Sequence, residues 1–142
     1  MSGIDKYRLV GLDSNVFIYH FEDNPKFTPH INVVFENLAK KHISGVTSII
    51  SVAETLSYPM PQRIVQEIEE GFRSIPNLTI FDLNYKIAYE AARIRRLYRF
   101  LKLPDAVQLA TALSAKAKIF ITNDKRLKTF KELPITLLTE IK

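Results

Sequence analysis

Apolar residues along this chain follow two alternating patterns. Short apolar runs, typical of strands buried on both faces of a sheet, lie at residues 7–12, 43–47, 78–83, 118–122 and 135–138. Between most of these runs, apolar residues recur every three or four positions, which is typical of amphipathic helices. This alternation predicts an α/β fold with a mainly parallel sheet of about five strands flanked by helices. The chain shows no repeat or linker, and we expect a single domain over residues 1–142.

Cap and turn residues suggest where several helices begin and end. The apolar segment 14–21 is short and predicts one or two helical turns. Thr28 is a candidate N-cap, with Pro29 at the first helical position after it. Ser48 is a candidate cap for the helix that carries Glu54, and we expect Glu54 on the flank of that helix. The apolar stripe expected to face the core there comprises Ile49, Val52, Ala53 and Leu56.

The second half of the chain contains two long helical patterns. Asn84 is a candidate cap for a helix that we expect to continue to Leu101. Pro104 should keep Leu103 out of helical geometry and begin the next helix. The pattern leaves two choices for the buried face of that next helix: Val107, Ala110, Thr111 and Ser114, or Leu109 and Leu113.

Four acidic residues lie at the edges of apolar runs: Asp13, Glu54, Asp105 and Asp124. Asp13 and Asp124 both follow predicted strands, and sites in open α/β sheets form beyond the carboxyl ends of the strands. If the fold brings the four together, each pair repels by about 3 kcal/mol at roughly 5 Å and an effective dielectric of about 20. A divalent cation relieves that repulsion, and hard oxygen ligands select Mg²⁺ or Mn²⁺. The acids therefore predict a metal site that activates water against phosphodiester bonds.

Each acid also has a simpler structural interpretation. Asp105 and Asp124 suit helix caps, Glu54 suits an exposed helical position, and Asp13 suits a turn. Polar neighbours that would orient the carboxylates are Ser14, Asn15, Thr122 and Asn123, although such residues also favour turns.

Basic residues near the acids are candidates for contacts with a nucleic acid. Arg96, Arg99 and Lys102 are spaced to share one helix face, and Lys125 and Arg126 follow the last of the four acids. A solvated helix face is the alternative. The net charge of +5 is compatible with a polyanionic substrate but is weak evidence for one.

Composition excludes several other classes of protein. With no cysteine among its 142 residues, the chain has no disulfide and no cysteine-based zinc site. No apolar run approaches the length of a membrane span, and the N-terminal residues lack the apolar region of a signal peptide. We therefore expect a cytoplasmic protein with no membrane partner.

Four motifs in order, LDSNV, VAET, LPDAVQLATAL and FITNDKRL, resemble those of PIN-domain proteins, and most closely the VapC-type toxins. The resemblance covers nearly the whole length. It implies that Asp13, Glu54, Asp105 and Asp124 are the acidic site residues and that Asn15 and Thr122 assist them. It also implies RNA cleavage with Mg²⁺ or Mn²⁺, a homodimer, and an antitoxin that holds the enzyme inactive. Many relatives carry a further acid where this chain has Arg126, so a second metal is in doubt.

The leading hypothesis is therefore a divalent-metal endoribonuclease that is the toxin of a toxin–antitoxin pair. Two alternatives remain open from the sequence. One is a non-catalytic module on the same fold that binds RNA or protein, and the other is a free-standing RNA-processing nuclease.

Overall fold

The computed structural model describes residues 3–142 and contains one five-stranded sheet, whose order is β3-β2-β1-β4-β5. Every neighbouring pair of strands is parallel, which confirms the predicted sheet and shows that it is wholly parallel. The strands are β1 (Leu9–Leu12), β2 (Ser44–Ser48), β3 (Leu78–Phe81), β4 (Ile119–Thr122) and β5 (Ile135–Leu137). Their bounds differ from the predicted runs by at most two residues. Residues 1 and 2 of the predicted domain lie outside the described residues.

Helices connect successive strands, as a parallel sheet requires. The α-helices among residues 3–142 are α1 (Ser14–Glu22), α2 (Thr28–Ala39), α3 (Ile50–Leu56), α4 (Gln62–Ser74), α5 (Tyr85–Leu97) and α6 (Leu103–Ser114). Short 3₁₀ helices are η1 (Gly3–Tyr7), η2 (Lys125–Thr129) and η3 (Leu138–Glu140). None of the helices in this described part of the chain is both long and apolar enough to cross a bilayer.

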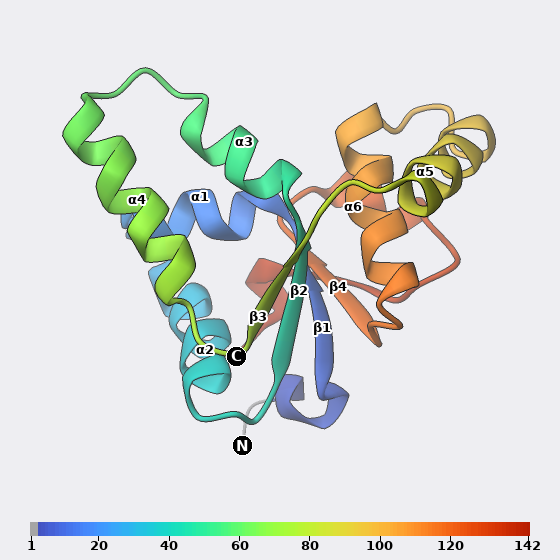
Figure 1. Ribbon diagram of the computed structural model, residues 1–142. Helices are drawn as coiled ribbons and strands as arrows, with labels where there is room; N and C mark the ends of the chain where they lie inside the picture. Colours follow the sequence, from blue (N-terminus) through green and yellow to red (C-terminus); the bar gives the residue numbers. More distant parts are fainter. Residues whose placement is uncertain (1–2) are drawn as a thin grey trace.

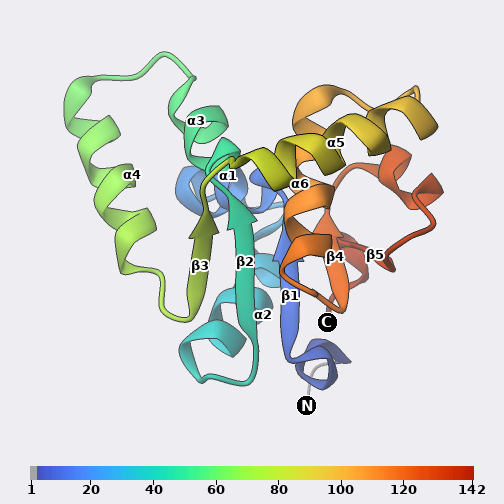
Figure 2. The same cartoon turned by 45° about the vertical axis from the view of Figure 1, so that its right-hand side comes forward.

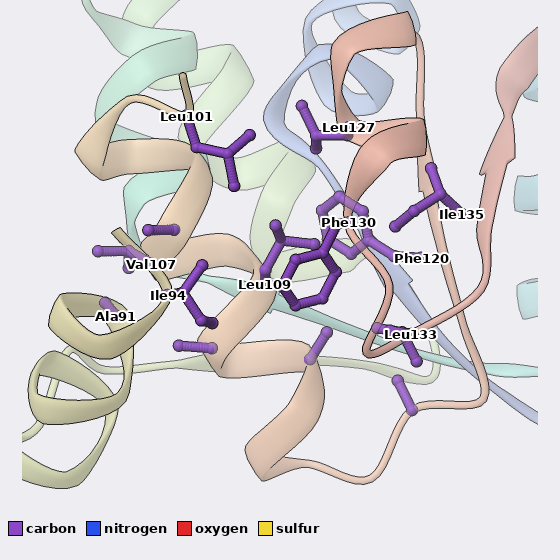
Figure 3. Packing of buried hydrophobic residues seen from close by; sticks show 14 of the residues in the cluster. Ala91, Ile94, Leu101, Val107, Leu109, Phe120, Leu127, Phe130, Leu133 and Ile135 are labelled. Carbon is purple, nitrogen blue, oxygen red and sulfur yellow. The ribbon is translucent and has the colours of Figure 1, made fainter. Parts of the chain in front are cut away.

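The sheet lies between two groups of helices (Figure 1). Helices α1, α2 and α4 pack against one face, and α5 and α6 pack against the other. Strand β4 shows how alternating residues serve the two layers. Ile119 and Ile121 join the core beneath α1 and α2, whereas Phe120 between them points into the core beneath α5 and α6 (Figure 3). The sheet is therefore buried on both faces, which explains its short continuous apolar strands.

Several predicted helix ends move by a few residues. Asn84 caps α5 as expected, because its side chain accepts a hydrogen bond from the Ile87 N–H. That helix ends at Leu97, however, and does not continue to Leu101. Thr28 is the first residue of α2 and not its cap, since its hydroxyl donates to the Asn24 carbonyl.

Helices α3 and α6 differ from the predicted packing. In α3 the buried residues are Ser51 and Thr55, whereas Ile49 and Ala53 of the predicted stripe are exposed and Val52 and Leu56 are only partly covered. The inward side of α3 takes part in buried hydrogen bonds, so it is polar. Helix α6 includes Leu103 as its first residue. Both of its candidate faces are largely covered, because residues 106–112 are all buried and Leu113 and Ser114 are partly buried.

A glycine in the central strand lets α6 approach the sheet closely. A Cβ atom at Gly11 would lie 2.9 Å from the Cβ of Ala112 and 2.9 Å from a ring carbon of Phe120. We expect Gly11→Ala to lower the free energy of unfolding by about 2 kcal/mol, since strand or helix must shift. Urea unfolding of this variant would measure the loss.

The control is Gly3→Ala, because no atom lies within 4 Å of a Cβ built at Gly3. The double variant Gly11→Ala with Ala112→Gly should recover part of the loss. If Gly11→Ala is as stable as the native chain, the inference that α6 and β1 pack too closely for a side chain at this position is wrong.

Candidate active site

The candidate site lies where the strands end and α1 and α3 begin (Figure 2). Asp13 follows β1 directly and is the N-cap of α1, with its carboxylate accepting from the Ser14 N–H at 2.8 Å. Asp124 follows β4, which is the neighbour of β1 in the sheet. Parallel pairing therefore puts both aspartates at the same edge of the sheet, where the Thr122 hydroxyl donates to the Asp13 carboxylate and accepts from the Asp124 N–H.

Asp13 is the most buried of the four acids, with 6% of its surface exposed. Its second carboxylate oxygen accepts from the Thr122 hydroxyl at 2.6 Å and lies 3.5 Å from the Asn15 amide nitrogen. Burial raises the pKa of Asp13 to about 6, against the lowering effect of the Thr122 hydrogen bond, and the negative charges of Asp105 and Glu54 raise it further. A buried carboxylate next to two other acids is an anion that a cation would stabilise strongly.

Glu54 joins the site through a serine. The Ser14 hydroxyl donates to a carboxylate oxygen of Glu54 at 2.6 Å and accepts from the Gln108 side-chain amide at 3.0 Å. Gln108 is 1% exposed and also donates to the Ser51 hydroxyl at 2.8 Å. Its carbonyl oxygen in turn accepts from the Ser48 N–H at 3.3 Å. Glu54 is thus held by a buried network that crosses from α1 to α3 and α6.

Asp105 and Asp124 share one basic partner. The Arg126 guanidinium lies 2.5 Å from a carboxylate oxygen of Asp124 and 3.4 Å from one of Asp105. The hydrogen bond from Arg126 holds the pKa of Asp124 below its ordinary value. Both aspartates also act as caps, because Asp105 accepts from the Lys102 N–H and Asp124 from the Arg126 N–H. The capping interpretation therefore holds for both residues, and it is compatible with a role at the site.

The remaining predicted companions tie β4 to α1. The side-chain oxygen Oδ1 of Asn15 accepts from the Asn123 backbone N–H at 3.1 Å, and the Asp124 N–H donates to the Thr122 hydroxyl at 3.1 Å. The Asn123 amide donates to the Tyr19 hydroxyl at 3.0 Å. These bonds fix the backbone that presents Asp13 and Asp124.

The four acids suit Mg²⁺ or Mn²⁺ in chemistry, because all their donors are carboxylate oxygens. Among residues 3–142, however, no three acidic or histidine side chains converge closely enough to hold one ion in this conformation. Asp105 and Asp124 are instead directed to Arg126. The chemistry of the donor set fits such a metal, and binding would require Asp105 and Asp124 to release the guanidinium.

The predicted basic face is only partly present. Helix α5 ends before Arg99 and Lys102, so these residues do not continue the face of Arg96 with helical spacing. Arg96 and Arg99 nevertheless line one groove of about 570 Å³ between α5 and the start of α6, together with Arg95. Lys102 lies near enough to Asp124 to lower its pKa. Arg126 contacts the acids, and Lys125 is exposed beside it.

The sequence pattern did not predict that Gln108 and Ser51 take part in the site. Both lie on helices whose apolar residues dominated the pattern, and Gln108 stands within the run AVQLATAL. A lone glutamine in such a run is a usable signal, since a buried amide requires partners. Ser51 precedes Glu54 by three positions, which places it near the same face of α3.

The raised pKa of Asp13 predicts an unusual dependence of stability on pH without metal. Its folded-state pKa of about 6 exceeds the ordinary value of 3.8. The stability that this carboxyl contributes is therefore complete below about pH 4 and is lost as pH rises through about 6. At pH 7 in a chelator, Asp13→Asn should unfold with a free energy about 1 kcal/mol higher than the native chain, because less charge is buried.

Urea unfolding at pH 7 and pH 4.5 checks this expectation. The advantage of Asp13→Asn should shrink toward zero at the lower pH, where the native carboxyl is already protonated. A gain of equal size at both values would show that charge burial is not its cause.

Comparison with known proteins agrees with this architecture. The family model of the PIN domain matches residues 10–133. No curated protein matches the chain. The chain is similar to the solved structure of VapBC2 from Rickettsia felis bound to a promoter DNA fragment, with a TM-score of 0.73, 20% identity, and coverage of 91% of this chain and 98% of that one. It is also similar to a toxin–antitoxin complex from Klebsiella pneumoniae, with a TM-score of 0.66, 22% identity, and coverage of 92% of this chain and 96% of that one.

A third similar structure is DNA-bound VapBC from Salmonella typhimurium, with a TM-score of 0.66, 18% identity, and coverage of 92% of this chain and 98% of that one. At these identities the likeness concerns the fold. The family match covers four of the five strands, apart from the first residue of β1, and every segment that supplies the four acids. The chain therefore belongs to the PIN domain family.

Proposed function

We propose that this protein is a divalent-metal-dependent endoribonuclease, acting as the toxin of a toxin–antitoxin pair. The observation that carries the proposal is the buried Asp13 carboxylate, which lies near two further acids at the carboxyl ends of the central strands of a PIN domain. A site that only binds RNA gains nothing from burying this charge. Mg²⁺ or Mn²⁺ bound there would lower the pKa of a water and offset charge on the phosphate.

The residues that would hold the metal are Asp13, Asp105, Asp124 and Glu54. Asp13 is oriented by Thr122 and by the Ser14 N–H, so its position does not depend on the ion. Glu54 is oriented by the Ser14 hydroxyl. Basic groups beside the site, Lys102 and Lys125, are suited to attract the RNA backbone.

RNA cleavage provides the test of catalysis. Purified protein should cut a labelled pool of single-stranded and structured RNAs in millimolar Mg²⁺ or Mn²⁺, and a chelator should stop the reaction. RNA binding without cleavage at any metal concentration would favour a non-catalytic module. Cleavage without toxicity on induced expression in bacteria would favour a free-standing RNA-processing nuclease.

An antitoxin partner is supported by the similar solved structures, which are VapBC or toxin–antitoxin complexes. On this chain, helices α1, α3 and α4 enclose a groove of about 280 Å³. Its lining is mainly apolar and includes Ile18, Phe21, Tyr58, Met60, Ile64 and Ile68. We propose this groove as the contact for an apolar segment of the antitoxin. Along α4, Phe72 is buried, whereas Ile64, Val65 and Ile68 are only partly covered, which leaves apolar surface for such a contact.

A homodimer is supported by apolar surface on the opposite side of the sheet. Large apolar side chains are exposed along α5, in the loops beside it and at the first residue of α6: Leu83, Tyr85, Tyr89, Leu97, Phe100 and Leu103. Large exposed apolar side chains are typical of association surfaces when they form a patch. Light scattering on the purified protein would measure the mass in solution.

A further inference from the structure

One feature of the site is a basic side chain among the acids. Arg126 bonds both Asp124 and Asp105, and its Nε also lies 3.1 Å from each carboxylate oxygen of Asp124. The two aspartates come from different elements, Asp105 from the first turn of α6 and Asp124 from the end of β4. The guanidinium therefore links two of the four proposed metal ligands.

The local backbone keeps Arg126 at this position. The Arg126 N–H donates to Asp124, the Thr129 hydroxyl donates to the Arg126 carbonyl, and the neighbouring Leu127 is fully buried. The Arg126 side chain, in contrast to this fixed backbone, is 46% exposed to solvent. It can leave the carboxylates for solvent without disturbing the core.

A guanidinium and a metal ion require the same oxygens. Each carboxylate lone pair that accepts from Arg126 is unavailable to an ion, and the positive charge of Arg126 repels a divalent cation nearby. This conformation agrees with such exclusion, since no three acidic or histidine side chains within residues 3–142 converge on one point.

We propose that Arg126 is an internal cation that competes with the divalent metal for Asp105 and Asp124. The inference rests on the proposed metal site and adds a control on its occupancy. Without metal, Arg126 neutralises two carboxylates. Metal binding requires that Arg126 release them, so the affinity of the native chain is lower than its four acids alone would give.

Calorimetric titration with Mn²⁺, in the absence of RNA, tests the competition. Arg126→Ala and Arg126→Gln should each bind Mn²⁺ about tenfold more tightly, because two partly exposed ion pairs and one like-charge repulsion are removed. Lys131→Ala is the matched control, since it removes the same charge from an exposed side chain that forms no ion pair among the described residues. Its affinity should change by less than about twofold.

The outcomes separate this inference from the function on which it rests. If the native chain binds Mn²⁺ and both Arg126 variants bind with unchanged or weaker affinity, the competition is wrong and the metal site stands. If neither the native chain nor the variants bind Mn²⁺ at millimolar concentration, both the proposed metal site and the proposed competition are wrong. Tight binding by the variants alone, or tenfold tighter binding by them, supports the competition. Circular dichroism in a chelator checks that each variant is folded.

Discussion

Asp13→Asn is expected to lower metal-dependent RNA cleavage by at least about 10³-fold, equivalent to about 4 kcal/mol of transition-state stabilisation. Asp13 is the most buried of the four acids and is held from two sides, by the Thr122 hydroxyl and the Ser14 N–H. Asparagine can keep the bond to Ser14 but removes the negative charge that a metal ion requires. Single-turnover cleavage of a labelled RNA at saturating Mn²⁺ measures the effect.

The fold should survive this substitution, and the metal-free stability described above provides the check. Asp23→Asn is the control, because Asp23 is an exposed carboxylate at the far end of α1 in the left-handed conformation, which asparagine tolerates. It should cleave at nearly the native rate. Native-like cleavage by a folded Asp13→Asn would reject the assignment of this residue.

Gln108→Leu should lower the free energy of unfolding by about 2–3 kcal/mol, since a buried polar network loses its central member. The side chain donates to Ser14 and Ser51 and accepts from the Ser48 N–H, and leucine can do none of this. Ser14 would then lose the bond that orients its hydroxyl toward Glu54. Cleavage should therefore fall about tenfold as well, because misplacement of a site group by a fraction of an ångström is costly.

Gln66→Leu is the matched control on α4, where the glutamine is exposed. Its stability should stay within about 0.5 kcal/mol of the native value. Urea unfolding and Mn²⁺ titration of both variants separate the two roles of Gln108. If Gln108→Leu loses stability but keeps native Mn²⁺ affinity and cleavage, the network supports the fold alone and does not position Glu54.

The sequence predicted the sheet well because burial on both faces makes each strand a continuous apolar run. The positions of Asp13 and Asp124 could also be predicted, since a residue that follows a parallel strand lies at a known edge of the sheet. The strand pattern alone did not assign Glu54 and Asp105 to the site, and the resemblance to PIN-domain proteins was needed to group them with the other two acids. Their connection through Ser14 and Arg126 depends on residues distant in sequence, which no local pattern contains.

Helix α3 shows where hydrophobic periodicity fails. The apolar residues Ile49 and Ala53 predicted an inward stripe, yet the helix buries Ser51 and Thr55. Gln108 and Ser14 meet Ser51 on that side, and a buried amide such as that of Gln108 requires partners, whereas the buried Thr55 hydroxyl has none among the described residues. The orientation of the helix follows its polar partners, and a scale of apolarity cannot register that preference.

The strand order also bears on how the protein is made. Strand β1 is translated first, yet one of its two neighbours in the sheet is β4, which comes much later in the chain. A nascent polypeptide that has not yet delivered β4 has no surface on which Thr122 could hold Asp13. If the protein is the nuclease proposed above, its activity would then arise only after β4 has been synthesised, and products of interrupted synthesis that lack β4 would be inactive.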